Sequence, residues 1–219
     1  MYIYHGSKVI IKKPIPKGSN PYNDYGASFY TTLDLDSAKS WACKSDALGY
    51  VNKYFLSTKK FDSFKILDLT DKSKYSILNW VAILIHFKQL DEKFKQRHTE
   101  ALKWLSKYYI DVYEYDVVIG YRADDAYFSF PTRFIANMIA LEDLEKIYLL
   151  GDLGIQYAFM SKRAVGSLKF VDAEMCDESF TGHYQKIVNQ ATIAFHKLIS
   201  APQDLSKTYI LDLMRKDNE

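Results

Sequence analysis

The chain has 219 residues, of which 48% are hydrophobic and 26% charged, so its composition excludes a disordered or fibrous protein. The formal net charge of +2 does not indicate a generally nucleic-acid-binding chain, although it leaves room for a local basic groove. Two cysteines cannot build a disulfide framework, and neither an export leader nor a bilayer-length apolar run is visible. We therefore expect a cytoplasmic protein that does not enter a membrane.

The N-terminal part predicts short strands separated by irregular chain. Prolines and glycines make residues 8–26 irregular. Asp34 or Asp36 can cap a helix over residues 36–48, because a short carboxylate accepts hydrogen bonds from the first free N–H groups. Strands, which are rich in β-branched and aromatic residues, are expected at 2–4, 27–32, 50–56 and 63–69.

A helical region is expected in the middle of the chain, as an insertion over about residues 72–110. Asp71 or Ser73 would open it, and a break is expected near 90–92. Its first part, "ILNWVAILIHF", is apolar almost throughout and predicts a buried helix. In its second part, apolar residues recur with helical spacing at Ala101, Leu102, Trp104, Leu105 and Tyr108.

The C-terminal part continues the alternation of strands and helices. The run "YDVVIGY" predicts the most deeply buried strand of the chain, and a helix that includes "FIANMIALEDLEKI" follows it. A final amphipathic helix over 179–199 would bury Ile187, Ala191, Ala194 and Leu198. Two further strands are expected at 156–161 and 167–173. The order of elements predicts a single α+β domain over residues 1–219.

Taken one at a time, the polar signals have ordinary structural interpretations. His5 at a strand end is more often a structural histidine, Tyr30 and Trp41 are more often core aromatics, and Gln156 opens a strand as surface residues do. The five histidines lack the spacing of a metal site, so no metal is expected. Glycine-rich phosphate loops, a nucleophile elbow and the kinase signatures are also missing from the sequence.

Taken together and in order, three stretches resemble the ADP-ribosyltransferase superfamily of the diphtheria-toxin and poly-ADP-ribose polymerase type. They are "YHGS", "GASFYTTLDLDSAKSWA" and "GIQYAFMSKRAVGSLKF". The superfamily has a His-Gly on its first strand and two aromatic residues with the separation of Tyr30 and Trp41, which have ten residues between them. More narrowly, the chain resembles the bacterial family DUF3990, whose members occur in toxin–antitoxin or phage-defence settings. The resemblance covers residues 1–50 and about 115–172.

The resemblance implies an ADP-ribosyltransferase-like split β-sheet core, an inserted helical region and a C-terminal helix, with NAD as co-substrate. It implies that His5 bonds a ribose hydroxyl and that Gly6 offers its backbone to the nicotinamide carboxamide, with Ser7 supporting the same amide. Tyr30 and Trp41 would sandwich the nicotinamide ring.

Gln156 departs from the family pattern, because most catalytic members have a glutamate at the matching position. A charge that stabilises a transition state in a dry site is worth several kcal/mol, so its loss matters. Three accounts remain open: Gln156 suffices, another acid compensates, or the protein binds NAD without turnover.

The motif "RADD" offers candidates for such compensation. Arg122 could pair with the NAD pyrophosphate or with an acidic target. Asp124 could contribute to cofactor binding, and either Asp124 or Asp125 could deprotonate the acceptor. Asp125 is equally well placed to cap the helix that follows.

The leading prediction is a mono-ADP-ribosyltransferase toxin that acts on RNA, DNA or protein and has a cognate antitoxin as partner. The alternative is a catalytically inactive module that binds NAD or ADP-ribose. A third possibility is a structural protein that uses the helical region 75–110 as a binding surface. The basic runs "KKFDSFK" and "KFKQR" would serve a nucleic-acid target, or would otherwise be solvated faces.

Overall fold

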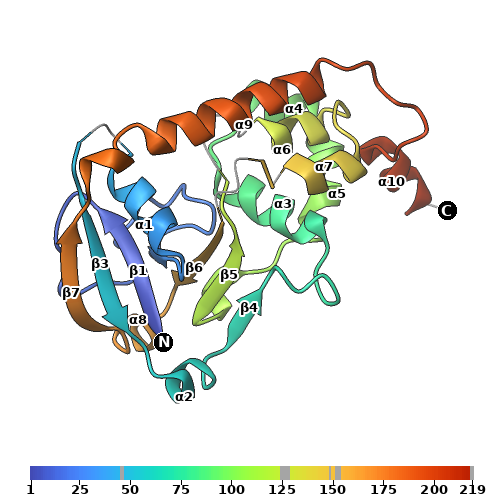
Figure 1. Ribbon diagram of the computed structural model, residues 1–219. Helices are drawn as coiled ribbons and strands as arrows, with labels where there is room; N and C mark the ends of the chain where they lie inside the picture. Colours follow the sequence, from blue (N-terminus) through green and yellow to red (C-terminus); the bar gives the residue numbers. More distant parts are fainter. Residues whose placement is uncertain (45–46, 124–128, 148, 151–153, 218–219) are drawn as a thin grey trace.

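The computed structural model describes residues 1–44, 47–123, 129–147, 149–150 and 154–217, and it has a mixed α+β architecture (Figure 1). The first sheet has the antiparallel order β1 (Tyr2–Ser7), β3 (Tyr50–Phe55), β7 (Lys169–Met175). The second sheet has the order β2 (Phe29–Thr31), β6 (Ile155–Phe159), β5 (Val117–Tyr121), β4 (Ile66–Asp68). In this second sheet only β4 and β5 are parallel. The expected α+β class is confirmed.

In the described part of the chain, the two sheets meet at one bridge, between β1 and the end of β2. Tyr4 N–H donates to Thr32 O at 2.8 Å, and Thr32 N–H donates to Tyr4 O at 2.9 Å. On its other side, β1 is paired with β3 along its whole length. The free edge of β1 beyond Tyr4 therefore faces the space between the two sheets.

Helices surround the sheets in two groups. Helix α1 contacts β1 and β3, and the long α9 runs from α1 across the top of the molecule to the helices beside the second sheet (Figure 1). The other group is built by contacts among α3, α5, α6 and α7 and between α5 and both α4 and α10. The α-helices are α1 (Leu35–Ala42), α2 (Thr58–Phe61), α3 (Ile77–Phe87), α4 (Glu92–Arg97), α5 (Thr99–Ser106), α6 (Phe130–Ile135), α7 (Leu141–Ile147), α8 (Lys162–Val165), α9 (His183–Ile199) and α10 (Ile210–Lys216). Short 3-10 turns cover Val112–Glu114 and Glu178–Phe180.

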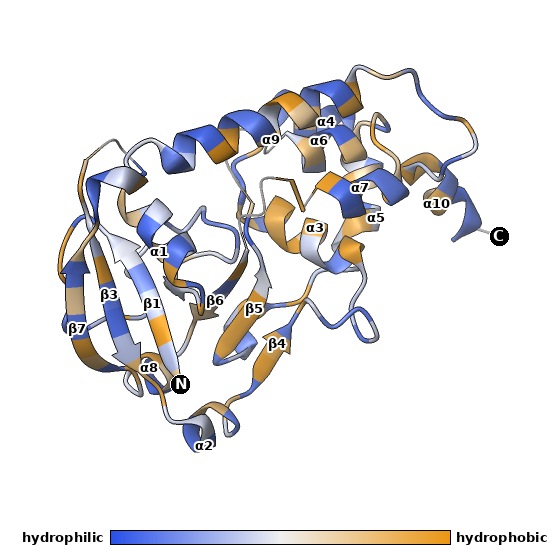
Figure 2. Ribbon diagram, in the orientation of Figure 1, coloured by the Kyte–Doolittle hydropathy of each residue, from blue (hydrophilic) through white to orange (hydrophobic). Residues whose placement is uncertain are grey.

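The larger core is centred on α3, which is buried as its composition predicts. The apolar character of α3, β4 and β5 is visible in Figure 2. The helix begins later than expected, because Ser76 rather than Asp71 or Ser73 is its N-cap. The side chain of Asn79 accepts a hydrogen bond from Ser76 N–H at 2.8 Å. None of the helices in the described part of the chain is both long and apolar enough to cross a membrane.

Two expectations about helices are wrong, and one helix is found that was not expected. The helix expected over 134–147 is two helices, because Asn137 has φ of 60° and so ends α6 in the left-handed conformation. The last long helix begins at His183, and Ala194 is exposed on it. Its buried residues are Tyr184, Val188, Ala191 and Phe195. Finally, α10 has no counterpart among the expected elements. Its C-cap residue, Asp217, accepts a hydrogen bond from Trp104 Nε1 of α5 at 2.8 Å.

Gly6 lets α1 pack directly on β1. A Cβ atom at this position would lie 2.1 Å from Ala38 O and 2.7 Å from Ala42 N, and both are backbone atoms of α1. Backbone atoms within a helix cannot rotate away as a side chain can. The first strand therefore needs a glycine here for packing, whatever else the residue does.

We expect Gly6→Ala to lower the free energy of unfolding by about 3 kcal/mol, at the upper end for overpacking. Chemical denaturation would measure this change. Gly18→Ala is the matched control, because its new methyl would meet mainly the side chain of Ile15, which is 64% exposed and free to turn. Equal stability of Gly6→Ala and the wild type would contradict the close contact of β1 with α1.

Candidate functional site

A cavity of about 470 Å³ lies where the two sheets meet, which is within the usual size range of small-molecule sites. Its walls come from β1, β2, α1 and β6, and from residues 8–28, here called the wall segment, which join β1 to β2. The cavity brings together six residues singled out by the sequence: His5, Gly6, Tyr30, Trp41, Arg122 and Gln156.

The other residues singled out by the sequence are Ser7, Asp124 and Asp125. Ser7, the last residue of β1, does not line the cavity; its hydroxyl donates to Val9 O at 2.5 Å, at the start of the wall segment. Asp124 and Asp125 lie outside the described residues. The N-cap position of α6 is Ser129.

Asn52, which the sequence does not single out, fixes the start of the wall segment. Its side chain is fully buried, and its Oδ1 accepts from Ile11 N–H at 2.7 Å. Its Nδ2 donates to Ser7 Oγ at 3.1 Å and Val9 O at 3.2 Å. From the same strand, the Tyr54 hydroxyl donates to Ile11 O at 2.5 Å. The predicted irregular stretch is therefore held against β3 at this end.

Tyr25 fixes the other end of the wall segment. Its side chain is fully buried, and its hydroxyl accepts from Trp80 Nε1 at 2.9 Å and donates to Tyr121 O at 2.7 Å. A Cβ at Gly120 would lie 2.1 Å from this hydroxyl, so the glycine in β5 makes the space for it. The residue before this anchor, Asp24, is thereby placed beside β6.

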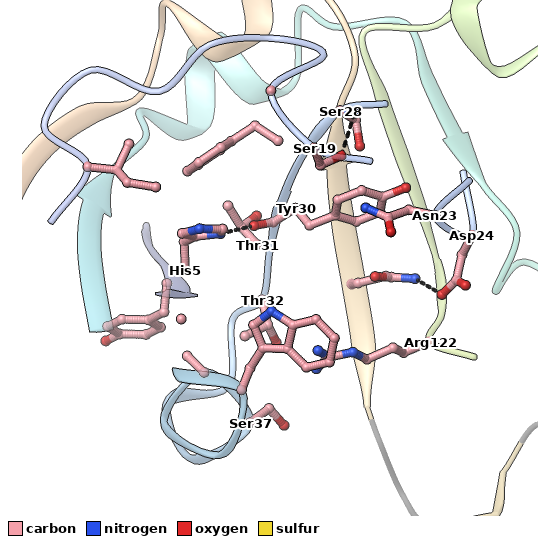
Figure 3. Close-up of a pocket in the computed structure, with 18 of the residues that line it drawn as sticks. His5, Ser19, Asn23, Asp24, Ser28, Tyr30, Thr31, Thr32, Ser37 and Arg122 are labelled. Atoms are coloured by element: carbon pink, nitrogen blue, oxygen red, sulfur yellow. Dashed lines mark hydrogen bonds between the residues drawn. The ribbon is translucent and has the colours of Figure 1, made fainter. Parts of the chain in front are cut away.

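Asp24 makes a direct hydrogen bond to Gln156 inside the cavity. Its Oδ2 accepts from Gln156 Nε2 at 2.8 Å (Figure 3). The same oxygen accepts from Ala123 N–H at 2.9 Å. Gln156 Nε2 also donates to Tyr121 O at 3.3 Å. Both acceptors lie on the nitrogen side of the amide, so Oε1 is the atom left to face the cavity.

The sequence gives no sign of this role for Asp24. The residue lies in the turn-rich stretch "NPYNDYG", where aspartate is common because its side chain supports turns. It is only 7% exposed in the fold. Burial raises the pKa of its carboxyl, whereas the Ala123 N–H, the nearby Lys88, the Gln156 amide and Arg122 act against that rise.

His5 is held by β2 across the junction of the sheets. Its Nδ1 lies 2.6 Å from Tyr30 O, and since a carbonyl only accepts, Nδ1 must carry the hydrogen (Figure 3). Its ring packs on Phe29, with ring centroids 4.5 Å apart. Burial lowers the pKa of His5, and Arg122 lowers it further against the opposing effect of the Tyr30 carbonyl. A neutral His5 of this tautomer offers Nε2 as an acceptor for a ligand hydroxyl.

The backbone of Gly6 also faces the cavity. In an antiparallel pair, alternate residues direct their N–H and C=O groups to the partner strand, and the others direct them away. Tyr4 directs both groups away from β3, to Thr32. Gly6 lies two residues further along β1 and so directs its N–H and C=O the same way. Since Gly6 lines the cavity, these two groups can reach a ligand there.

Tyr30 and Trp41 differ in what holds or covers their rings. The Tyr30 hydroxyl donates to Gly26 O at 2.7 Å and accepts from Tyr25 N–H at 3.0 Å, which fixes its ring. The Trp41 ring carries the Arg122 guanidinium, with Cζ 3.4 Å from the ring centroid, and the Lys44 ammonium at 4.4 Å. A flat ligand can therefore stack on the face of Trp41 that Arg122 covers only after Arg122 moves.

The cavity is strongly positive. Four cationic side chains line it, namely Lys13, Lys44, Lys88 and Arg122, whereas Asp24 is the one acid among the described lining residues. Arginine and lysine bind phosphate oxygens well, and clustered like charges raise the local concentration of an anionic ligand. The site is thus suited to a phosphate-bearing ligand. Within the described ranges, no group of three or more His, Cys, Asp or Glu residues could hold a metal ion.

Comparison with known proteins gives one match. Residues 1–170 match the model of a family described as protein of unknown function, DUF3990. Neither the curated proteins nor the solved structures contain a match to this chain. The matched residues include every described residue that lines the cavity.

We expect the imidazole of His5 to titrate below its ordinary value of about 6.5, because burial and Arg122 both disfavour the charged form. NMR of histidine-labelled protein would measure this pKa. Because folding lowers it, the unfolded state binds the proton first, and stability contributed by His5 is lost as the pH falls below about 6.5.

The matched variant is Arg122→Met, which should bring the pKa of His5 back towards its ordinary value by removing one of the lowering charges. A His5 that titrates at or above about 6.5 in the folded wild type would contradict a buried, neutral imidazole.

Proposed function

We propose that this chain, which belongs to the DUF3990 family, is an NAD-dependent mono-ADP-ribosyltransferase with an ADP-ribosyltransferase-like split-sheet fold. Its reaction is cleavage of the bond between nicotinamide and ribose, with transfer of ADP-ribose to a macromolecular acceptor. One observation carries the proposal. His5, Gly6, Tyr30, Trp41 and Gln156, which the superfamily pattern predicts from distant stretches of sequence, line the same cavity.

Each group offers what one part of NAD requires. The Gly6 N–H and C=O are complementary to the carboxamide of nicotinamide, which has an acceptor and a donor of its own. The neutral His5 accepts a hydrogen bond from a ribose hydroxyl through Nε2. The cations Arg122 and Lys44 are close enough to share the Trp41 ring and can receive the pyrophosphate.

Binding in this way also provides part of the catalysis. The transition state resembles an oxocarbenium ion, so orientation of the ribose and nearby electron-rich groups lower its free energy. Gln156 Oε1 faces the cavity and can hold a second ribose hydroxyl. Arg122 leaves the face of Trp41 when it pairs with a phosphate, and this movement frees the face for the nicotinamide ring.

The biological setting in this proposal rests on the resemblance alone. It is that of the cytoplasmic toxin of a bacterial toxin–antitoxin or phage-defence system, with RNA, DNA or protein as acceptor and an antitoxin protein as partner. The second candidate is a module that binds NAD or ADP-ribose without turnover. One observation favours it, namely that the position of the usual glutamate is filled by the uncharged Gln156.

We expect the purified protein to release nicotinamide from NAD, and chromatography of the product would measure the rate. His5→Ala should lower kcat/KM by about 100-fold or more, because the ribose loses a positioning contact. The matched control is His196→Ala on the exposed side of α9, which should leave the rate unchanged. Equal rates for His5→Ala and the wild type would remove the site assignment.

A second measurement separates the proposed activity from the alternative. Labelled NAD is incubated with the protein and a cell lysate, and the products are digested with protease or nuclease. Loss of label with one digestion identifies the class of acceptor. Binding of NAD without nicotinamide release or label transfer would instead support the binding module.

A further inference from the structure

We infer that Asp24 is a positioning residue for this reaction: it orients Gln156 and supplies the negative charge that a glutamate at position 156 would carry. The inference rests on the proposed function and extends it to a residue outside the family pattern. Asp24 and Gln156 come from different elements, the wall segment and β6, and meet in the cavity.

The neighbours of Gln156 fix the orientation of its side-chain amide. A glutamine side chain can turn over so that either its nitrogen or its oxygen faces a ligand. The end of the Gln156 amide that points away from the cavity lies against Asp24 Oδ2 and Tyr121 O. The Tyr121 carbonyl can only accept a hydrogen bond, and so can the Asp24 carboxylate when it is ionised. Turning the amide over would place three oxygens against one another. Gln156 therefore presents an acceptor to the cavity, as a glutamate would.

The negative charge of Asp24 lies close to the position that a ligand would occupy beside Gln156. The carboxylate oxygen of Asp24 lies 2.8 Å from Gln156 Nε2, so the negative charge is one side chain away from the ligand. Asp24 is 7% exposed, and charges act more strongly where water is excluded. Asp24 is also the one acid among the lining residues that the structure describes. No other described lining residue can supply the negative charge.

Several groups around Asp24 favour its ionised form. Burial raises the pKa of the carboxyl overall, and the Ala123 N–H, Lys88, Gln156 and Arg122 oppose that rise. The neighbouring phenols of Tyr25 and Tyr30 stay neutral, since burial raises both of their pKa values. His5, held by its bond to Tyr30, also remains neutral near pH 7. The positive charges of Lys88 and Arg122 therefore favour the carboxylate against the effect of burial.

Asp24 takes no part in making or breaking bonds. The bond between the ribose carbon and the pyridinium nitrogen breaks, and its electron pair stays on the ring nitrogen, so that nicotinamide leaves uncharged. A lone pair of the acceptor forms the new bond to the same carbon, and the acceptor's proton passes to solvent. Positive charge on the ribose is largest between these events, when a carboxylate one side chain away lowers its energy most.

The test moves the charge from one residue to the other. Asp24→Asn keeps an oxygen for both N–H donors and removes the charge, and we expect kcat for nicotinamide release to fall about 100-fold with KM for NAD within about threefold. Gln156→Glu alone places two carboxylates in contact; because they share one proton, the pair keeps the net charge of the wild type, and kcat should stay within about tenfold of it. In the double variant, the charge sits at position 156, and kcat should return to within about tenfold of the wild type.

Two controls separate charge from folding. Asp36→Asn removes an acid whose side chain is 73% exposed on α1, and it should leave kcat unchanged. In the pH profile of kcat, the wild type should lose activity in acid as Asp24 takes up a proton, at a higher pH than an ordinary aspartate because its pKa is raised. Asp24→Asn should lack this limb.

Each outcome decides the matter. No nicotinamide release by the wild type would overturn the proposed function and this inference with it. Release by the wild type that Asp24→Asn leaves unchanged would overturn the inference alone. A double variant as slow as Asp24→Asn would also overturn it, because restoring the charge would then have no effect. Rescue by the double variant, with NAD binding retained throughout, would establish it.

Discussion

The hydroxyl of Tyr25 joins three parts of the molecule that are distant in sequence, and both the core and the site depend on it. A buried phenol needs hydrogen-bond partners, and here they are Trp80 on α3 and the carbonyl of Tyr121 at the end of β5. Gly120 provides the space, because any Cβ would meet the hydroxyl. Once Tyr25 is fixed, the neighbouring Asp24 has little freedom, and its carboxylate lies beside β6. The fixed position of Tyr25 therefore determines both how the large core packs and where the carboxylate of Asp24 lies in the cavity.

The cavity lies where the two sheets are joined by one bridge among the described residues. Within this described part, no strand pairs with the edge of β1 beyond Tyr4 and Thr32, and an unpaired edge presents N–H and C=O groups to whatever lies beside it. Gly6 occupies this edge and also permits contact with α1, so one residue meets two requirements. Its place in the sequence motif "HGS" is accounted for by packing even before a ligand is considered.

The sequence predicts well those helices and strands whose burial is visible as a local run of apolar residues. The apolar run of α3 and the continuous apolar run of β5 are both found where expected, because burial on all sides leaves a simple signature. The break after α6 was not predictable, since it rests on one residue, Asn137, adopting φ of 60°. Asp24 was missed for a similar reason. Its importance comes from the tertiary bonds of its neighbour Tyr25, and an aspartate in a turn looks the same with or without them.

The wall segment is held near its start by Asn52 and near its end by Tyr25, and this has a consequence for how relatives can differ. The free energy of closing a loop between fixed ends rises only slowly with its length. Residues 12–18 can therefore be lengthened, shortened or exchanged while both anchors, and the sheets behind them, stay in place. Lys13 and Ile15, which line the cavity, belong to this stretch. The fold thus separates the anchored part of the cavity wall from a part whose length and side chains can change at little cost in stability.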